Sequence, residues 1–177
     1  FKHDIAGYLA RWAPELGIHS LDELIECIRN NPHPDSPYFK FDLLEVAARR
    51  GNLESAEYHD ALKVCKRLSR TEGIDASLHS HGLHAILAPT SSPAWKTDPV
   101  LGDAEHIESA TLPAVAGYPN ITVPAGTVQG LPVGLSFFSG LDTEAILIRL
   151  AQAFEKKADL RLRPSFAATI DTYTGNS

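Results

Sequence analysis

The stretch Ala114-Val-Ala-Gly-Tyr-Pro-Asn-Ile-Thr-Val-Pro-Ala-Gly126, continued by Leu131-Pro-Val-Gly-Leu-Ser-Phe-Phe-Ser-Gly140, decides the fold. Its first part contains a β-branched run, Ile121 to Val123, between an asparagine and a proline. Such a run, bounded by turn-forming residues, predicts a short buried strand.

The second part of this stretch predicts another strand over residues 133–138, flanked by a proline and a glycine. The Gly126–Gly130 connection is short, which favours antiparallel pairing of the two strands. Gly134 lies inside the second strand, where glycine weakens pairing unless another backbone or a ligand comes close.

A helix is expected directly after this pair of strands. Asp142 can cap its start and two lysines close its last turn, where the helix dipole favours cations. Apolar residues repeat at helical spacing between them: Ile146, Leu147, Leu150, Ala151 and Phe154. The apolar stripe predicts packing against the sheet.

The preceding part of the chain is mainly helical. Its longest expected helix runs from Ser55 to about Glu72 and resumes past Gly73, with four residues predicted to face inward: Tyr58, Leu62, Cys65 and Leu68. The apolar run 83–88 predicts a buried strand, and 91–107 an irregular surface segment.

These elements predict an α/β fold with helices packed on a mixed sheet. We expect one partial domain over 1–177, with a mainly helical half at 1–82 and a strand-containing half at 83–177 that ends in a helix.

Composition narrows the class of protein. Apolar residues make up 44% and charged residues 21%, as is typical of globular domains. A net charge of −6 without a Lys/Arg run argues against nucleic acid or an anionic membrane as a partner. The sequence has no long apolar span, so we expect a cytoplasmic protein, and nothing in it calls for a cofactor.

Two clusters of side chains are candidates for chemistry. His79, His81 and His84 suggest a metal site, but their spacing does not make the side chains converge, so we expect none. Ser91-Ser92 follows a strand, where a nucleophile could stand. Pro93 follows the pair and no glycine flanks it, which favours a role in the loop.

The ordered segments "LHAILAPTSSPAW", "AVAGYPNITVPAG", "GLPVGLSFFSG" and "AILIRLAQAFEKKADLRLRPSF" resemble the carboxy-terminal part of the amidase signature family. The family's Gly/Ser-rich signature, with its nucleophilic serine, and the upstream catalytic lysine do not occur here. The chain also has no methionine, not even at position 1. We therefore expect a fragment that contains no catalytic residue.

The resemblance implies an intact parent that hydrolyses carboxamide C–N bonds by serine acyl transfer, with a small-molecule amide as substrate. This chain would be inactive alone and would supply one wall of the substrate pocket. The residues that the resemblance implies for this wall are Thr90, Ser91, Trp95 and Asp142. For Asp142 the alternative role, as the helix N-cap, stays open.

A second hypothesis is a non-catalytic binding or assembly module, such as a structural part of an amidotransferase. In either case the short apolar sheet predicts that the chain binds its missing upstream half or associates with itself, since open sheet edges pair with other chains.

Overall fold

The computed structural model describes residues 1–33, 41–98, 100–104, 107–160 and 163. Contacts divide the chain into two compact units, Phe1–Leu62 and Lys63–Ser177. Within the described residues, every helix is too short or too polar to span a membrane.

The first unit is helical. It contains α1 (Lys2–Trp12), the short 3₁₀ helix η1 (Pro14–Leu16), α2 (Leu21–Asn30), α3 (Asp42–Ala48) and the start of α4 (Ala56–Lys66). Ser20 caps α2 by accepting a hydrogen bond from the Glu23 N–H, and the Glu23 carboxylate accepts one from the N–H of His19. Its buried apolar residues are Leu9, Leu21 and Ile25.

The second unit begins within α4, which continues into the π-helix η2 (Arg67–Ile74) and then into α5 (Asp75–His81). The wider π turn needs a glycine at Gly73, because a Cβ there would lie 2.4 Å from the Leu68 carbonyl oxygen. The strands and last helices follow: β1 (Ile86–Pro89), α6 (Thr111–Ala116), β2 (Asn120–Val128), β3 (Leu131–Phe138) and α7 (Glu144–Ala158).

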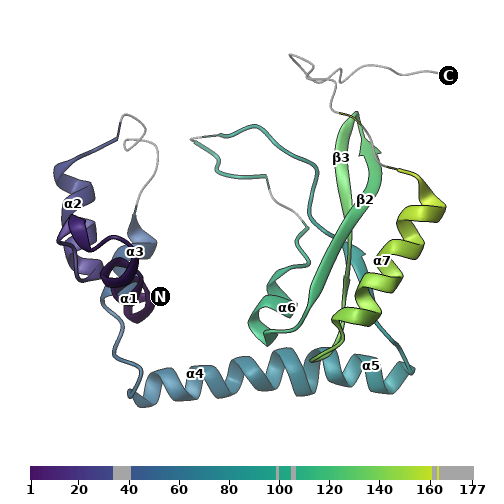
Figure 1. Ribbon diagram of the computed structural model, residues 1–177, viewed down its shortest axis with the longest axis horizontal. Coiled ribbons are helices and arrows are strands. Elements are labelled where there is room, and N and C mark those ends of the chain that lie inside the picture. Colours follow the sequence, from purple (N-terminus) through teal and green to yellow (C-terminus); the bar gives the residue numbers. More distant parts are fainter. Residues whose placement is uncertain (34–40, 99, 105–106, 161–162, 164–177) are drawn as a thin grey trace. The chain divides into compact units, whose positions relative to one another are not determined.

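The three strands form a sheet in the order β1-β3-β2, and both pairs are antiparallel. Figure 1 shows the hairpin of β2 and β3. The expected α/β architecture and the antiparallel pairing of the two strands of the hairpin are confirmed. The predicted Gly126–Gly130 connection is too long, because β2 continues through an irregularity between Pro124 and Gly126. A positive φ of 113° lets Gly126 accommodate it, so the turn shrinks to Gln129-Gly130.

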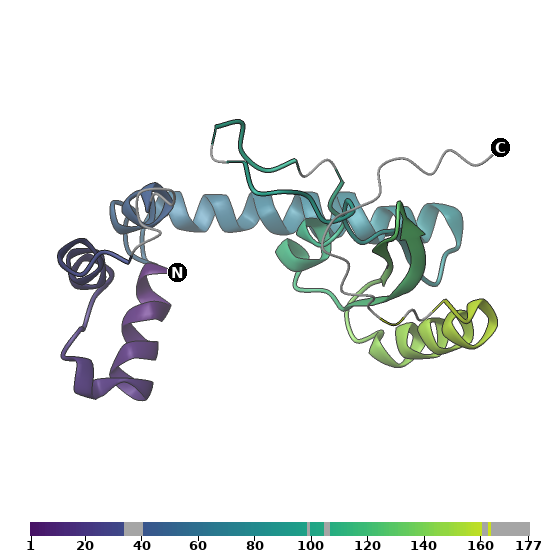
Figure 2. The ribbon, with the colours of Figure 1, turned by 90° about the horizontal axis from the view of Figure 1, so that it is seen from above.

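Helices cover both faces of this sheet (Figure 2). On one face Phe138 packs with Ile74 of η2 and Ala116 of α6 in a fully buried cluster. On the other face α7 buries Leu147 and Ala151, and Phe154 makes an edge-to-face contact with Phe137 of β3. The predicted packing of the last helix against the sheet is confirmed.

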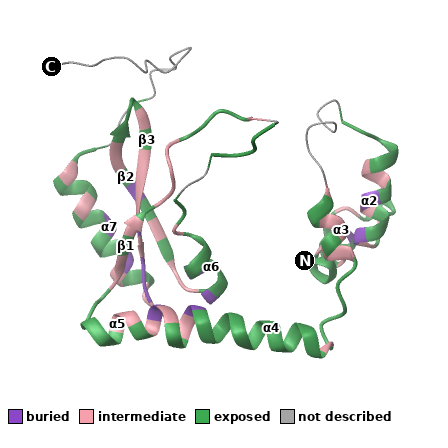
Figure 3. Ribbon diagram, turned by 180° about the vertical axis from the view of Figure 1, so that it is seen from behind, coloured by how far each residue is buried: buried purple, intermediate pink, exposed green. Residues whose placement is uncertain are grey.

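The long helix does not bury the stripe expected from its periodicity. Tyr58, Leu62, Cys65 and Leu68 are all exposed, whereas Ser69 and Ile74 are buried. Figure 3 shows α4 exposed along its whole length. Periodicity gives the residues that share a face, but burial needs another element against that face. Packing of α6 and the sheet begins only within η2, and the register of the π-helix brings Ser69 and Ile74 inward.

Candidate functional site

A long loop begins at the end of β1. The Thr90 N–H donates to the Gly134 carbonyl (2.9 Å), and the Thr90 carbonyl accepts from the N–H of Ser109 (3.2 Å). Ser91 forms an antiparallel bridge with Glu108. The segment 91–108 therefore leaves the sheet and returns to it at one place, Thr90, as expected for a surface segment at the end of a strand.

Ser91 itself takes part in a local turn. Its hydroxyl donates to the carbonyl of Ser92 (3.1 Å), and the side chain is half-buried. The Ser92 hydroxyl in turn accepts from the Ile107 N–H (3.0 Å). These bonds support the loop role that the sequence favours for the serine pair over nucleophilic catalysis.

Trp95 lies further out in the same loop, where its indole N–H donates to the carboxylate of Asp103 (3.0 Å). Beside it, Asp98 accepts from the N–H groups of Leu101 and Val100, and these bonds hold the pKa of its carboxyl below the ordinary value. Internal bonds thus shape the loop around Trp95.

Asp142 lies elsewhere, in the turn between β3 and α7, with φ = 57° and an exposed side chain. Its predicted alternative role as helix N-cap is wrong. Thr143 occupies the N-cap position, and its hydroxyl donates to the Gly140 carbonyl (2.7 Å). The left-handed turn at Asp142 shifts the start of the helix by one residue beyond the position inferred from spacing.

The sheet separates the predicted wall residues into two groups. Thr90 lies opposite Gly134 in the middle of β3, whereas Asp142 follows the last residue of the strand, Phe138. From Gly134 to Phe138 the strand rises about 13 Å, at about 3.3 Å per residue. The structure therefore brings together Thr90 and Ser91, and it does not bring Asp142 to them.

Two residues that sequence analysis missed meet Thr90. Its hydroxyl lies 2.9 Å from the Ser136 hydroxyl and 3.4 Å from that of Thr122, and Thr122 and Ser136 are 2.9 Å apart. We call this trio, one residue from each strand region, the hydroxyl cluster. The signal that could have revealed it was Gly134, whose missing side chain leaves room for a neighbouring group to approach.

A second polar network lies at the Asp142 end of the sheet. The Tyr118 hydroxyl donates to Asp75 (3.1 Å), and the guanidinium of Arg70 lies 5.1 Å from the tyrosine ring. The Arg70 Nε–H donates to the Ala116 carbonyl (2.6 Å). Burial, together with the bond to Asp75, raises the pKa of Tyr118 above its ordinary value. This network fixes the turn between α6 and β2.

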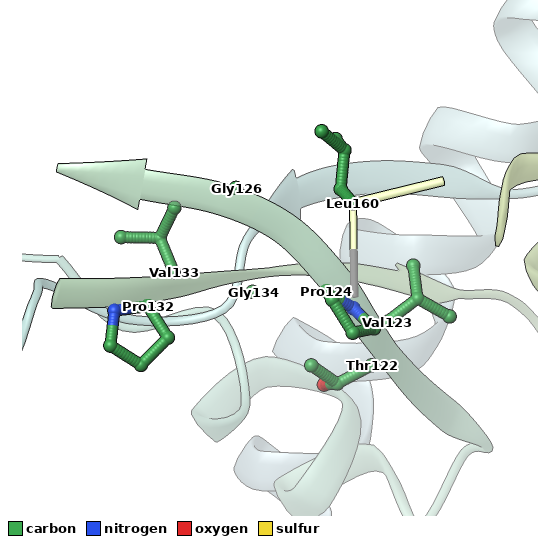
Figure 4. A pocket seen from close by; sticks show the side chains of 8 residues that line it. All are labelled: Thr122, Val123, Pro124, Gly126, Pro132, Val133, Gly134 and Leu160. Carbon is green, nitrogen blue, oxygen red and sulfur yellow. The ribbon is translucent and has the colours of Figure 1, made fainter. Parts of the chain in front are cut away.

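An open groove of about 420 Å³ runs along the hairpin (Figure 4). The described residues that line it are mostly apolar, and among them Thr122 bears a hydroxyl: Thr122, Val123, Pro124, Gly126, Pro132, Val133, Gly134 and Leu160. Thr122 and Gly134 connect the groove to the hydroxyl cluster.

The histidines at the end of α5 are not arranged as a metal site. The ring Nδ1 of His79 forms a hydrogen bond with the carbonyl of Asp75 (2.8 Å). Among residues 1–33, 41–98, 100–104, 107–160 and 163, no group of three or more His, Cys, Asp or Glu side chains is placed to hold a metal ion.

The fold places the second unit in the class of α/β domains. Helices cover both faces of its antiparallel sheet, and a long loop follows the end of β1. No family model matches the chain. Over 116 residues it is 34% identical to the glutamyl-tRNA(Gln) amidotransferase A subunit of Pseudomonas putida (strain W619), a match that covers 62% of this chain and 24% of that protein.

Solved structures match more of the chain. It is 36% identical to the native peptide amidase of Stenotrophomonas maltophilia, with a TM-score of 0.81 over 97% of this chain and 33% of that one. A peptide amidase in complex with the competitive inhibitor chymostatin is 37% identical, with a TM-score of 0.86 over 94% of this chain and 34% of that one. The chain thus spans a quarter to a third of the length of these relatives. The resemblance to the carboxy-terminal part of the amidase signature family is confirmed.

Proposed function

We propose that this chain is part of an amidase that hydrolyses non-peptide carboxamide C–N bonds by serine acyl transfer, and that it is inactive alone. The observation that carries the proposal is the similarity to peptide amidases, which extends over 94–97% of the chain with TM-scores of 0.81 and 0.86. The substrate would be a small-molecule amide.

The proposed contribution of this chain is a wall of the substrate pocket. Thr90, Ser91 and Trp95 would act from the loop that leaves β1, and Asp142 from the turn before α7. Serine acyl transfer needs a nucleophile, a base and donors for the oxyanion. The resembled family takes its nucleophile from a Gly/Ser-rich signature and its base from a lysine upstream of it, and neither motif occurs in these 177 residues. The catalytic groups would come from outside this chain.

The second candidate is a non-catalytic assembly module within an amidotransferase. It is favoured by relatives found by sequence that are amidotransferase A subunits, such as those of Pseudomonas putida, Azotobacter vinelandii and Clostridium kluyveri. The coding sequence upstream of Phe1 separates the two candidates, because an amidase requires the Gly/Ser-rich signature and its lysine there.

The activity test compares two proteins, the 177-residue chain and a longer product that includes the upstream coding sequence. Both are assayed for ammonia release from a panel of simple carboxamides. We expect turnover only in the longer protein. Turnover by the 177-residue chain that disappears in Ser91→Ala would refute the assignment, and an inactive longer protein would favour the assembly module.

We also propose that the isolated chain binds its upstream half or associates with itself. In the described sheet, β1 and β2 each pair only with β3 and so keep one unpaired edge. Leu87 of β1 is 55% exposed, which adds an apolar side chain beside that edge. Light scattering coupled to gel filtration would contradict the proposal if it gave a 19.2 kDa monomer at micromolar concentration.

A further inference from the structure

The hydroxyl cluster joins three regions that are distant in sequence. Thr90 and Ser136 are 46 residues apart, and Thr122 and Ser136 are 14 apart. Ser136 is fully buried, and its hydroxyl lies 2.9 Å from each of the other two. A buried hydroxyl needs partners, because leaving it unsatisfied costs the free energy of its desolvation. Thr90 and Thr122 supply them.

Gly134 creates the room in which the cluster forms. A Cβ at this position would lie 2.7 Å from Thr90 Oγ1 and 2.8 Å from Thr122 Cγ2. The two threonine side chains therefore lean over the glycine from the neighbouring strand regions and reach Ser136, two residues further along β3. Any side chain at Gly134 would push them apart.

The same threonine holds the loop. Its backbone N–H is bonded to the Gly134 carbonyl, and its carbonyl accepts from both the N–H and the hydroxyl of Ser109 (3.2 and 3.3 Å). A second backbone hydrogen bond joins the two ends of the loop two residues further from the sheet: the Ser92 N–H donates to the Ile107 carbonyl (3.0 Å). Thr90 is thus bonded to the sheet through its hydroxyl and its N–H, and to the returning end of the loop through its carbonyl.

We propose that the hydroxyl cluster is a positioning device: Thr90, Thr122 and Ser136 set the direction in which the segment 90–95 leaves the sheet. Because that segment would form the pocket wall, the consequence for catalysis rests on the proposed function, whereas the positioning itself does not. Thr90 and Ser136 act as positioning residues. Gly134 has no side chain and so leaves room for the threonine side chains.

Hydrogen exchange of backbone amides tests the device in the 177-residue protein. Thr90→Val keeps the shape of the side chain and removes the hydroxyl, whereas Thr90→Ser keeps the hydroxyl. We expect Thr90→Val to speed exchange at Ser92 and Ser109 by about tenfold, the effect of losing one buried hydrogen bond, without changing exchange at Ala151 in α7. Thr90→Ser should restore the slow exchange.

Two outcomes would overturn the proposal. One is unchanged exchange at Ser92 and Ser109 in Thr90→Val. The other is an equal rise at Ala151, which would mean that the hydroxyl only contributes to global stability. If Thr90→Val does not fold, Thr122→Val, on the exposed side of the cluster, is measured against the same two outcomes.

Kinetics of the longer protein give a separate readout. If it is an active amidase, Thr90→Val should raise KM more than it lowers kcat, because a displaced wall weakens substrate binding before it affects chemistry. An inactive longer protein would contradict the proposed function and leave the exchange result to decide the positioning role.

Discussion

Replacing Gly134 with alanine should destabilise the second unit, because overpacking of this kind costs about 1–3 kcal/mol, with about 2 kcal/mol as the central value before any opposing effect. The new Cβ would lie 2.7 Å from Thr90 Oγ1, 2.8 Å from Thr122 Cγ2 and 3.1 Å from Thr90 Cβ, all well inside ordinary contact. The threonine side chains could avoid this clash by rotating away from residue 134. Rotation would break their hydrogen bonds to Ser136, each of which contributes about 1 kcal/mol.

One effect opposes this loss. Alanine restricts the unfolded chain more than glycine does, which returns about 0.4–1 kcal/mol. Clash and rotation are alternative routes to relief and do not add, so the net loss is about 1–1.5 kcal/mol. Urea unfolding followed by circular dichroism would show a lower midpoint with an unchanged m-value.

A double-mutant cycle with Thr90→Ala supplies the control. Thr90→Ala removes the closest clashing atom, so Gly134→Ala should cost at least about 1 kcal/mol less in that background. The reasoning is refuted if Gly134→Ala is as stable as the parent chain, or if its cost is the same in both backgrounds. Either result would mean that the threonines do not occupy the space above the glycine.

The remaining predictions concern the two layers of helices. Because the raised pKa of Tyr118 favours its protonated form in the fold, its contribution to stability is complete below the ordinary value of 10.0 and is lost as pH rises through the folded pKa. Urea midpoints at about pH 8 and about pH 10.5 should therefore fall further for the parent chain than for Tyr118→Phe, and parallel decreases would contradict this. In α7, Leu147→Ala should cost about 2–5 kcal/mol, because Leu147 is 1% exposed. The neighbouring Ile148→Ala, at a residue 58% exposed, should cost much less, and equal costs in thermal or urea unfolding would mean that α7 packs differently.

Local sequence was sufficient for the hairpin and for the helix that covers it. The β-branched run at 121–123 and the strand at 133–138 between a proline and a glycine depend on neighbours a few residues away, as do the apolar repeats of α7. The cap of α2 is equally local, because Ser20 and Glu23 are three residues apart. These interactions form within single turns or strands, so their residue patterns carry the information.

Other features depend on which elements meet. Tyr58, Leu62, Cys65 and Leu68 share one face of the long helix, as their spacing predicts. Spacing does not show whether another element packs against that face, and in the structure all four residues are exposed. The exchange of N-cap from Asp142 to Thr143 follows from one left-handed backbone angle, which several residue types tolerate.

The hydroxyl cluster illustrates the same division within the candidate site. Sequence analysis marked Thr90 and Gly134, each for its own reason, and passed over Thr122 and Ser136. Only the register that sets Ala88 and Thr122 on either side of Ser136 brings the three hydroxyls within reach. That register depends on burial of Phe138 and Ile86 against η2 and α6, a long-range packing choice that local residue patterns do not contain.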